Sequence, residues 1–308
     1  MGSTMFDNAM AGGRRKGFQI AANHVIRARV AAAFLACVVL IPNVVFAQGE
    51  ADSARDVTLY ELLLRDGSRL YGRIERQDEV EVVFRTQGGA TVTSRRVEIA
   101  SLKEVTGSMV EGEFLAQDPN ATRLFFGPTG RSLKKGQAYF GVYDFFVPFV
   151  QVGVTDRLSV GAGTPLVFGF DESERPFWVT PKLQLVNAKA MQVSVGVLHA
   201  FNFDGHGGGI GYLVGTRGGA QSSFTVGAGA AYGSRGTRSG VLMVGGDRLV
   251  RRHLKLITES YVWKGGDGVV SGGIRFFGDR FSADLALAFP VGTGEFFGFP
   301  VINFVHVF

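Results

Sequence analysis

Seven polar side chains in the second half of the chain have the types and the spacing to line an aqueous passage. They are Lys182, Gln184, Lys255, Glu259, Arg275, Asp284 and Asn303. Charges that face the inside of a pore set its ion selectivity and steer solutes. Inside a narrow barrel the same side chains would instead pair with one another and fill the interior. The residue types therefore indicate a polar lumen, and they leave open whether it is open or filled.

Other reactive side chains do not gather into a recognisable catalytic or metal site. A nucleophile needs a base within hydrogen-bond reach, and no serine shares a strand face with both a histidine and an acid. Asp204 and His206 are too few ligands for a metal, and His306 lies on the face of Phe304 and Phe308. We predict no catalytic residue, no resident metal and no cofactor. A membrane-bound hydrolase is the third functional hypothesis.

Alternation of apolar and polar residues indicates that β-strands carry the lining side chains. Twelve strands are predicted, at 137–143, 146–155, 157–168, 177–187, 190–202, 208–217, 221–232, 239–247, 252–264, 268–277, 280–290 and 298–308. Strands of about 9–11 residues cross a bilayer when they are tilted. A soluble β-sandwich would share the alternation, but it would not need large aromatic side chains on its outward face. An all-β fold with an antiparallel transmembrane barrel is predicted, with ten or fourteen strands as alternatives.

The connections between these strands alternate between short and long, which places the short ones at one membrane face. The link from Gly246 to Arg252 is an exception, because it is long and basic on the side of the short connections. Trp178 begins one strand and Trp263 ends another, both at the membrane face opposite the short connections. Both tryptophans are therefore predicted to belong to an aromatic girdle at the outer membrane–water interface.

The last strand ends in Phe304, His306 and Phe308, which share one face. A terminal Phe that closes an alternating strand resembles the ending of bacterial outer-membrane β-barrel proteins. This resemblance implies that the three residues form an assembly signal for the barrel-assembly machinery. It also implies that residues 137–308 lie in outer-membrane lipid, with both ends of the barrel in the periplasm.

An export signal at the other end of the chain supports this location. Residues 31–47 are apolar, follow Arg27 and Arg29, and end in the small residue Ala47, as secretory signals do. Residues 1–47 are thus predicted to be a signal peptide that contains Cys37, the only cysteine, and residues 48–56 a flexible segment. Cleavage removes five basic residues and one acid, so the net charge of +5 falls to about +1 and is no argument for nucleic-acid binding.

Residues 57–106 are predicted to form a small periplasmic β-domain of five strands. The stretches DGSRLYGRI and VVFRTQGGATVTSRRVEIASL resemble SH3-like or Sm-like domains. Sm-like folds bind RNA, but a domain behind an export signal meets none. A spacer role, or a periplasmic protein partner, is the expected alternative.

Residues 107–136 are predicted to be a linker between this domain and the barrel. Gly127 and Gly130 lack the spacing of a phosphate-binding loop. Leu124, Phe125 and Phe126 are predicted to pack against the periplasmic rim or to enter the lumen.

A passive pore or narrow channel with a polar lumen is the function that these features favour. The second hypothesis is a structural or interaction protein, in which a filled barrel anchors the periplasmic β-domain. The expected partners are membrane lipid and the barrel-assembly machinery, with no nucleic acid.

Overall fold

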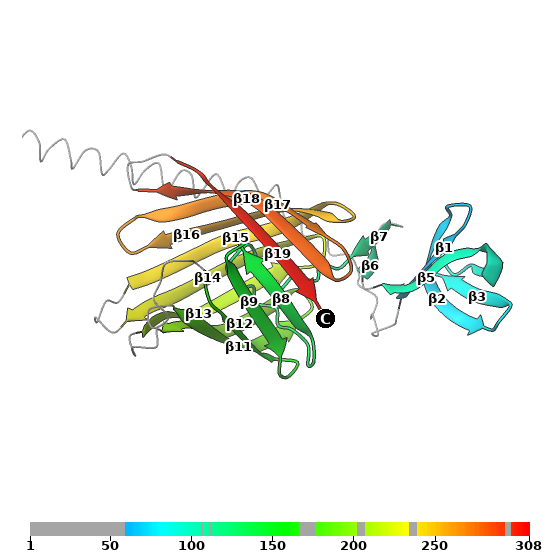
Figure 1. The fold of residues 1–308 in the computed structure, drawn as a ribbon, viewed down its shortest axis with the longest axis horizontal. Coiled ribbons are helices and arrows are strands. Elements are labelled where there is room, and N and C mark those ends of the chain that lie inside the picture. Colours follow the sequence, from blue (N-terminus) through cyan, green and yellow to red (C-terminus); the bar gives the residue numbers. More distant parts are fainter. Residues whose placement is uncertain are drawn as a thin grey trace, which may run out of the picture.

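A computed structural model describes residues 59–105, 107–110, 113–166, 176–201, 207–233, 239–292 and 297–308. The predicted signal peptide, the segment 48–56, Asp204 and His206 lie outside these residues. The described part forms a closed twelve-stranded antiparallel barrel, a five-stranded sheet and a two-stranded hairpin (Figure 1). The predicted all-β fold class and the number of barrel strands are therefore confirmed. No helix among the described residues is long and apolar enough to cross a bilayer.

The barrel wall runs without a break from β8 to β19. Its strands are β8 (Ala138–Tyr143), β9 (Val147–Gly153), β10 (Leu158–Gly163), β11 (Phe177–Ala188), β12 (Met191–Phe201), β13 (Gly207–Gly218), β14 (Ser222–Gly233), β15 (Ser239–Arg251), β16 (Leu254–Trp263), β17 (Gly268–Phe277), β18 (Phe281–Val291) and β19 (Phe299–Val307). The last strand pairs with the first, with Phe304 opposite Val142, and Phe308 N donates to Ala138 O at 2.8 Å. Because lipid offers no hydrogen bonds, only such closure satisfies every strand in a membrane.

Burial in the barrel is inverted relative to a water-soluble sheet. On β18 the apolar side chains of Leu285 and Leu287 are about half exposed, whereas Asp284, on the opposite face of the same strand, is buried. On β11 the same holds for Leu183, which is exposed, and Lys182, which is buried. Apolar residues outside and charges inside are the pattern of a barrel whose outer surface meets lipid.

The turn between β15 and β16 corrects the predicted long link at residues 246–252. Strand β15 continues to Arg251, with Asp247 opposite Ile257 and Leu249 opposite Lys255, and a bulge follows Leu249. Most of the residues that were predicted as a loop are therefore paired between β15 and β16. The turn is short, and the exception to the alternation of short and long connections disappears.

The small N-terminal unit is a five-stranded antiparallel sheet in the order β4-β3-β2-β1-β5. Its strands are β1 (Leu59–Leu64), β2 (Arg69–Gln77), β3 (Glu81–Thr86), β4 (Thr91–Arg95) and β5 (Ile99–Val105), with the short helix η1 (Arg96–Glu98) before β5. Leu62, Val82 and Phe84 form its buried core. All five predicted strands are present, with β4 and β5 as the edges of the sheet. The SH3-like or Sm-like resemblance stays a prediction.

The hairpin of β6 (Gly107–Val110) and β7 (Glu113–Ala116) joins the small sheet to the barrel. Phe114 and Ala116 pack in one apolar cluster with Leu59 of β1 and Phe277 of β17. The Phe114 ring also stacks on Tyr71 of β2, with centroids 4.4 Å apart. The region predicted as a linker therefore begins with an ordered element that contacts both units.

Candidate functional site

Residues 118–131, here called the inserted segment, occupy the inside of the barrel. Their hydrogen-bonding partners come from strands on every side of the wall. These partners are Tyr139 and Tyr143 of β8, Lys182 and Gln184 of β11, Ser194 of β12, Thr216 of β13, Lys255 and Glu259 of β16, Arg275 of β17 and Asn303 of β19. Only a segment within the closed barrel can reach all of these strands. The inserted segment therefore occupies the lumen in the described structure.

The inserted segment has a hairpin-like structure of its own. Leu124 N donates to Gly127 O at 2.9 Å, and Thr129 N donates to Thr122 O at 3.0 Å, so the chain reverses at Leu124–Gly127. At this turn, Leu124 and Phe125 are buried in an apolar cluster against Ile257. The segment therefore enters the lumen and returns, and its apolar turn packs against the wall.

Two glycines allow the inserted segment to approach the wall closely. A Cβ atom on Gly127 would lie 2.3 Å from Met243 Sδ, and one on Gly130 would lie 2.2 Å from Gln192 O. At Gly130 the clash is with backbone, so glycine is required there, whereas a side chain at Gly127 would have to displace the Met243 side chain. The two glycines that do not fit a phosphate-binding loop thus have a packing role.

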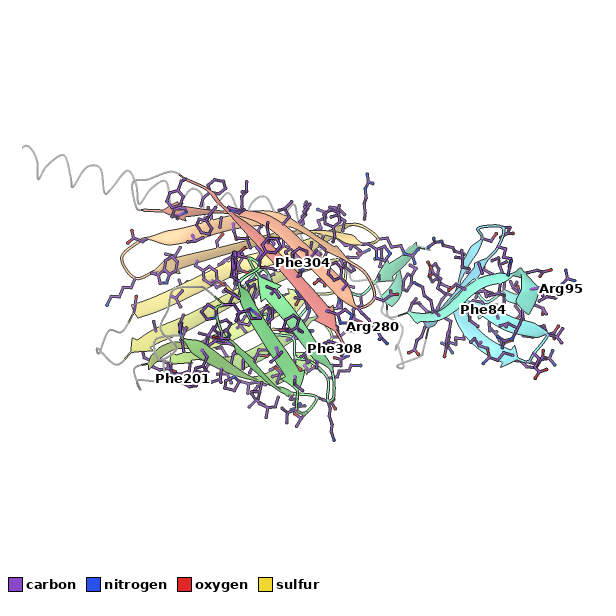
Figure 2. The ribbon with its side chains drawn as sticks, viewed as in Figure 1. Phe84, Arg95, Phe201, Arg280, Phe304 and Phe308 are labelled. Atoms are coloured by element: carbon purple, nitrogen blue, oxygen red, sulfur yellow. The ribbon has the colours of Figure 1, made fainter. Side chains whose placement is uncertain are left out.

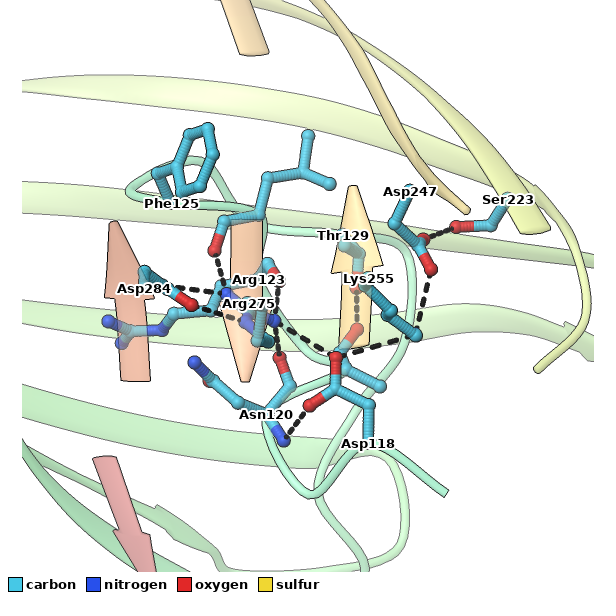
Figure 3. A network of polar contacts seen from close by, with 12 residues as sticks. Asp118, Asn120, Arg123, Phe125, Thr129, Ser223, Asp247, Lys255, Arg275 and Asp284 are labelled. Atoms are coloured by element: carbon cyan, nitrogen blue, oxygen red, sulfur yellow. Dashed lines mark hydrogen bonds and ion pairs between the residues drawn. The ribbon is translucent and has the colours of Figure 1, made fainter. Parts of the chain in front are cut away.

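Arg275 is the centre of a buried ion network (Figure 3). Its guanidinium donates to Asp284 at 2.6 Å and to Asp118 at 3.1 Å. It also donates to the carbonyl oxygens of Asn120 at 3.0 Å and Leu124 at 2.6 Å. One wall residue therefore holds both the carboxylate and the backbone of the inserted segment. Such charge-assisted hydrogen bonds are about twice as strong as neutral ones.

Lys255 extends this network toward β15. Its Nζ lies 2.7 Å from Asp247 and 3.4 Å from Asp118, and Ser223 donates a short hydrogen bond to Asp247. Asp247 was not among the predicted lining residues, because the predicted strand ended there and the residue lost its place in the alternation.

Glu259 binds the turn of the inserted segment through backbone amides. Its carboxylate accepts from Phe125 N at 2.8 Å, Phe126 N at 3.2 Å and Gly127 N at 3.1 Å, and Tyr261 donates its hydroxyl at 2.7 Å. Three successive N–H groups that converge on one carboxylate form an anion-binding nest. The negative charge of Glu259 is thus balanced by dipoles of the inserted segment rather than by a cation.

Lys182 and Gln184 hold the returning limb of the inserted segment. Lys182 Nζ donates to Arg131 O at 2.6 Å and, at longer range, to Thr122 O and Thr129 O. Gln184 Nε2 and Ser194 Oγ both donate to Gly130 O at 2.9 Å. In these contacts the wall donates and the segment's carbonyl groups accept.

The structure places the seven predicted lining residues together around the inserted segment. All seven are buried. Six of them contact the segment directly, including Asn303, which donates to Phe125 O at 3.1 Å. Asp284 contacts it through Arg275. Asp118, Arg123 and Thr216 were not predicted as lining residues, and of these only Thr216 carries a strand-alternation signal.

Arg123 lies on the other side of the inserted segment, in an aromatic cage. Its guanidinium carbon is 3.9 Å from the ring centre of Phe149 and 5.0 Å from those of Tyr139 and Tyr143. It donates to both tyrosine hydroxyls, while its buried Nε has no partner. Next to this cage the structure contains a cavity of about 390 Å³, whose wall also includes Trp178.

The positions of the two tryptophans correct the predicted aromatic girdle. Trp178 shares the register of Lys182 and lines the cavity inside the barrel. Trp263 shares the register of Glu259, is partly exposed at the end of β16, and stacks on Tyr261. Strand alternation places both indoles on the lumen side, so neither serves as a lipid anchor on the outer wall.

Of the predicted assembly residues, Phe304 lies on β19 and Phe308 directly follows this strand (Figure 2). His306 and Phe308 are exposed, with ring centres 4.8 Å apart. Val305, on the opposite face of β19, is buried. Recognition of these residues by an assembly machinery stays a prediction. Among the described residues, no group of three or more histidine, cysteine or acidic side chains could hold a metal.

A docking contact holds the small sheet against the end of the barrel. Glu61 of β1 accepts hydrogen bonds from Tyr71 and, at 2.9 Å, from Arg252 in the β15–β16 turn, and Lys103 lies 3.2 Å from Asp279. Burial alone would raise the pKa of Glu61. The hydrogen bonds from Tyr71 and Arg252, together with the charge of Lys103, outweigh burial and lower this pKa from 4.5 to about 2.

The lowered pKa predicts how docking responds to pH. The stabilisation by Glu61 is fully present above pH 4.5 and is lost as the pH falls toward 2. Replacing Arg252 by Met is expected to raise the pKa of Glu61 and to weaken docking by about 1 kcal/mol, since water screens a partly exposed pair. An NMR titration of the Glu61 carboxyl group measures the change in its pKa.

The control is Arg69→Met, which removes a more exposed contact to Glu61 within the small sheet. An unchanged pKa in Arg252→Met would contradict the docking contact.

Solved outer-membrane barrels are similar to this chain in overall form. A KdgM porin in complex with disordered oligogalacturonate has a TM-score of 0.44 and 8% identity, over 56% of this chain and 98% of that chain. An outer membrane channel from Pseudomonas putida F1 has a TM-score of 0.39 and 13% identity, over 58% of this chain and 97% of that chain. No protein-family model and no curated protein matches the chain. The assignment of a membrane barrel rests on its own strand pairing and apolar outer surface.

Proposed function

We propose that the protein is an outer-membrane channel that its own inserted segment closes at rest. One observation supports this proposal: a segment of the same chain, joined to the chain at both ends, lies inside the barrel against its polar wall. Eight-stranded barrels are filled by their side chains alone, whereas barrels of 16–18 strands hold an aqueous channel. Twelve strands leave room for a segment or for water, so removal of the segment would leave a passage.

The resting state is closed because the inserted segment and the wall share their buried charges. Withdrawal of the segment would separate Asp118 from Arg275 and strip the amide donors from Glu259. Removing one partner of a buried ion pair costs about 3–5 kcal/mol. Opening therefore requires a stimulus, or water that replaces the lost contacts, and spontaneous openings are rare.

A second function, a filled barrel that anchors the small periplasmic sheet, is favoured by one specific observation. The small sheet contacts the barrel through Glu61 and Arg252 and through the apolar cluster around Phe114. A barrel that only anchors this sheet needs no passage, and its lumen stays filled under all conditions.

Conductance in planar lipid bilayers separates the two functions. The wild-type protein is expected to conduct little. A variant in which a glycine–serine linker of equal length, flexible by composition, replaces residues 119–131 is expected to show stable openings of at least tenfold higher mean conductance. Arg252→Met is the control, because it disturbs docking and leaves the segment in place. A replaced variant that folds, as judged by its heat-modifiable gel mobility, and still does not conduct would establish the anchor function instead.

A further inference from the structure

The buried charges of the lumen are divided unevenly between its two sides. Among the described residues, the barrel interior holds the acids Asp118, Asp247, Glu259 and Asp284 and the cations Arg123, Lys182, Lys255 and Arg275. All three aspartates belong to the network of Arg275 and Lys255. Glu259 is held by amide groups and Tyr261. Arg123 and Lys182 are thus left without a carboxylate partner in the described structure.

These two cations border the same cavity. Its volume of about 390 Å³ lies in the range of small-molecule sites, roughly 300–1,000 Å³. Arg123 is 8% exposed and Lys182 is 2% exposed, so water screens neither charge well. A buried charge without a counter-charge is costly, and an anion in the cavity would remove that cost.

The rest of the cavity wall selects for a body that is flat and apolar. Tyr139, Tyr143, Phe149, Trp178 and Tyr212 contribute rings to it, and Gln151 and Thr180 contribute polar groups. Aromatic walls bind ring-shaped ligands by stacking. The Arg123 guanidinium carries five N–H donors, of which two donate to the tyrosine hydroxyls and the buried Nε has no partner.

The cavity lies on the side of the inserted segment that faces away from the small sheet. Its lining includes Trp178 near the start of β11 and Ala200 near the end of β12. Phe201, the last residue of β12, lies at the end of the barrel opposite the small sheet (Figure 2). A ligand would therefore enter from the end of the barrel where the longer connections lie.

We infer that this cavity is a binding site for a small organic carboxylate with a planar apolar body, bonded to Arg123 and attracted by the charge of Lys182, against the aromatic wall. The carboxylate bonds to the guanidinium, and the ring lies between Trp178 and the tyrosines. The site exists while the inserted segment is in place, so the inference does not depend on movement of that segment.

Benzoate is the probe that tests this site, with benzamide as its neutral counterpart. Trp263→Phe leaves Trp178 as the only tryptophan, so the fluorescence of the detergent-solubilised full chain reports on the cavity. Benzoate is expected to change this fluorescence saturably at neutral pH. Benzamide is expected to bind at least tenfold more weakly, because it lacks the charge that meets Arg123 and Lys182.

Two further variants in the same background locate the binding. Arg123→Gln is expected to weaken benzoate binding at least tenfold. Ala200→Phe narrows the cavity, leaves both cations in place, and is expected to abolish binding. This variant still tests the site if Arg123→Gln does not fold. Equal affinity for benzoate and benzamide, absence of a saturable change, or unaltered benzoate binding in folded Ala200→Phe would overturn the inference.

Discussion

Replacing Arg275 by Met is expected to lower the free energy of unfolding by about 3–5 kcal/mol. Methionine fills much of the same volume but donates no hydrogen bond. Asp118 and Asp284 would then face each other across a buried space without their shared cation. The carbonyl oxygens of Asn120 and Leu124 would lose their donor as well. This is the largest single loss that the ion network predicts.

Urea titration of the folded, heat-modifiable form in lipid vesicles measures this loss. Arg280→Met is the matched control, since Arg280 is exposed in the β17–β18 turn only five residues away (Figure 2). A surface substitution of this kind changes stability by no more than about 0.5 kcal/mol. If the two variants unfold at the same urea concentration, Arg275 does not hold the inserted segment in the manner described.

Glu259→Gln is expected to loosen the turn of the inserted segment without unfolding the barrel. The amide side chain has nearly the same shape, but it loses the charge and turns an N–H group toward N–H donors. Loss of a charge-assisted hydrogen bond costs about 1.5–3 kcal/mol. The backbone amides of Phe125, Phe126 and Gly127 are therefore expected to exchange with solvent about ten- to a hundredfold faster.

Hydrogen exchange at these three amides checks the prediction directly. Asp267→Asn serves as the control, because it removes one acidic charge from an exposed position in the adjoining β16–β17 turn. The same Glu259→Gln protein is expected to open more often in planar bilayers than the wild type. Fast exchange without any added conductance would show that the segment moves but does not gate a passage.

Strand alternation in the sequence predicts the barrel wall well, because every second side chain must face either lipid or lumen. Lys182 and Gln184 are buried for this reason, as are Lys255, Glu259 and Arg275 on neighbouring strands. The same rule applied to Trp178 and Trp263 would have placed both indoles on the lumen side. Their position near a strand end suggested a girdle, but the register decides the face.

The filling of the lumen was not predictable in the same way. Asp118, Asn120 and Arg123 lie in an irregular stretch, where no period of two or 3.6 residues reports burial. Arg275, the partner of Asp118 and Asn120, is more than 150 residues away in the chain, and the closed barrel brings them together. The apolar sequence of Leu124, Phe125 and Phe126 was the one local signal, since three such residues are unusual in an exposed linker.

The seam of the barrel lies next to the inserted segment in the chain. The segment leads into β8, which pairs with β19, and two of its partners, Arg275 and Asn303, lie on β17 and β19. A barrel that closed around an empty lumen would leave both sets of polar groups to water alone. Seating of the segment and closure of the seam are therefore expected to favour each other.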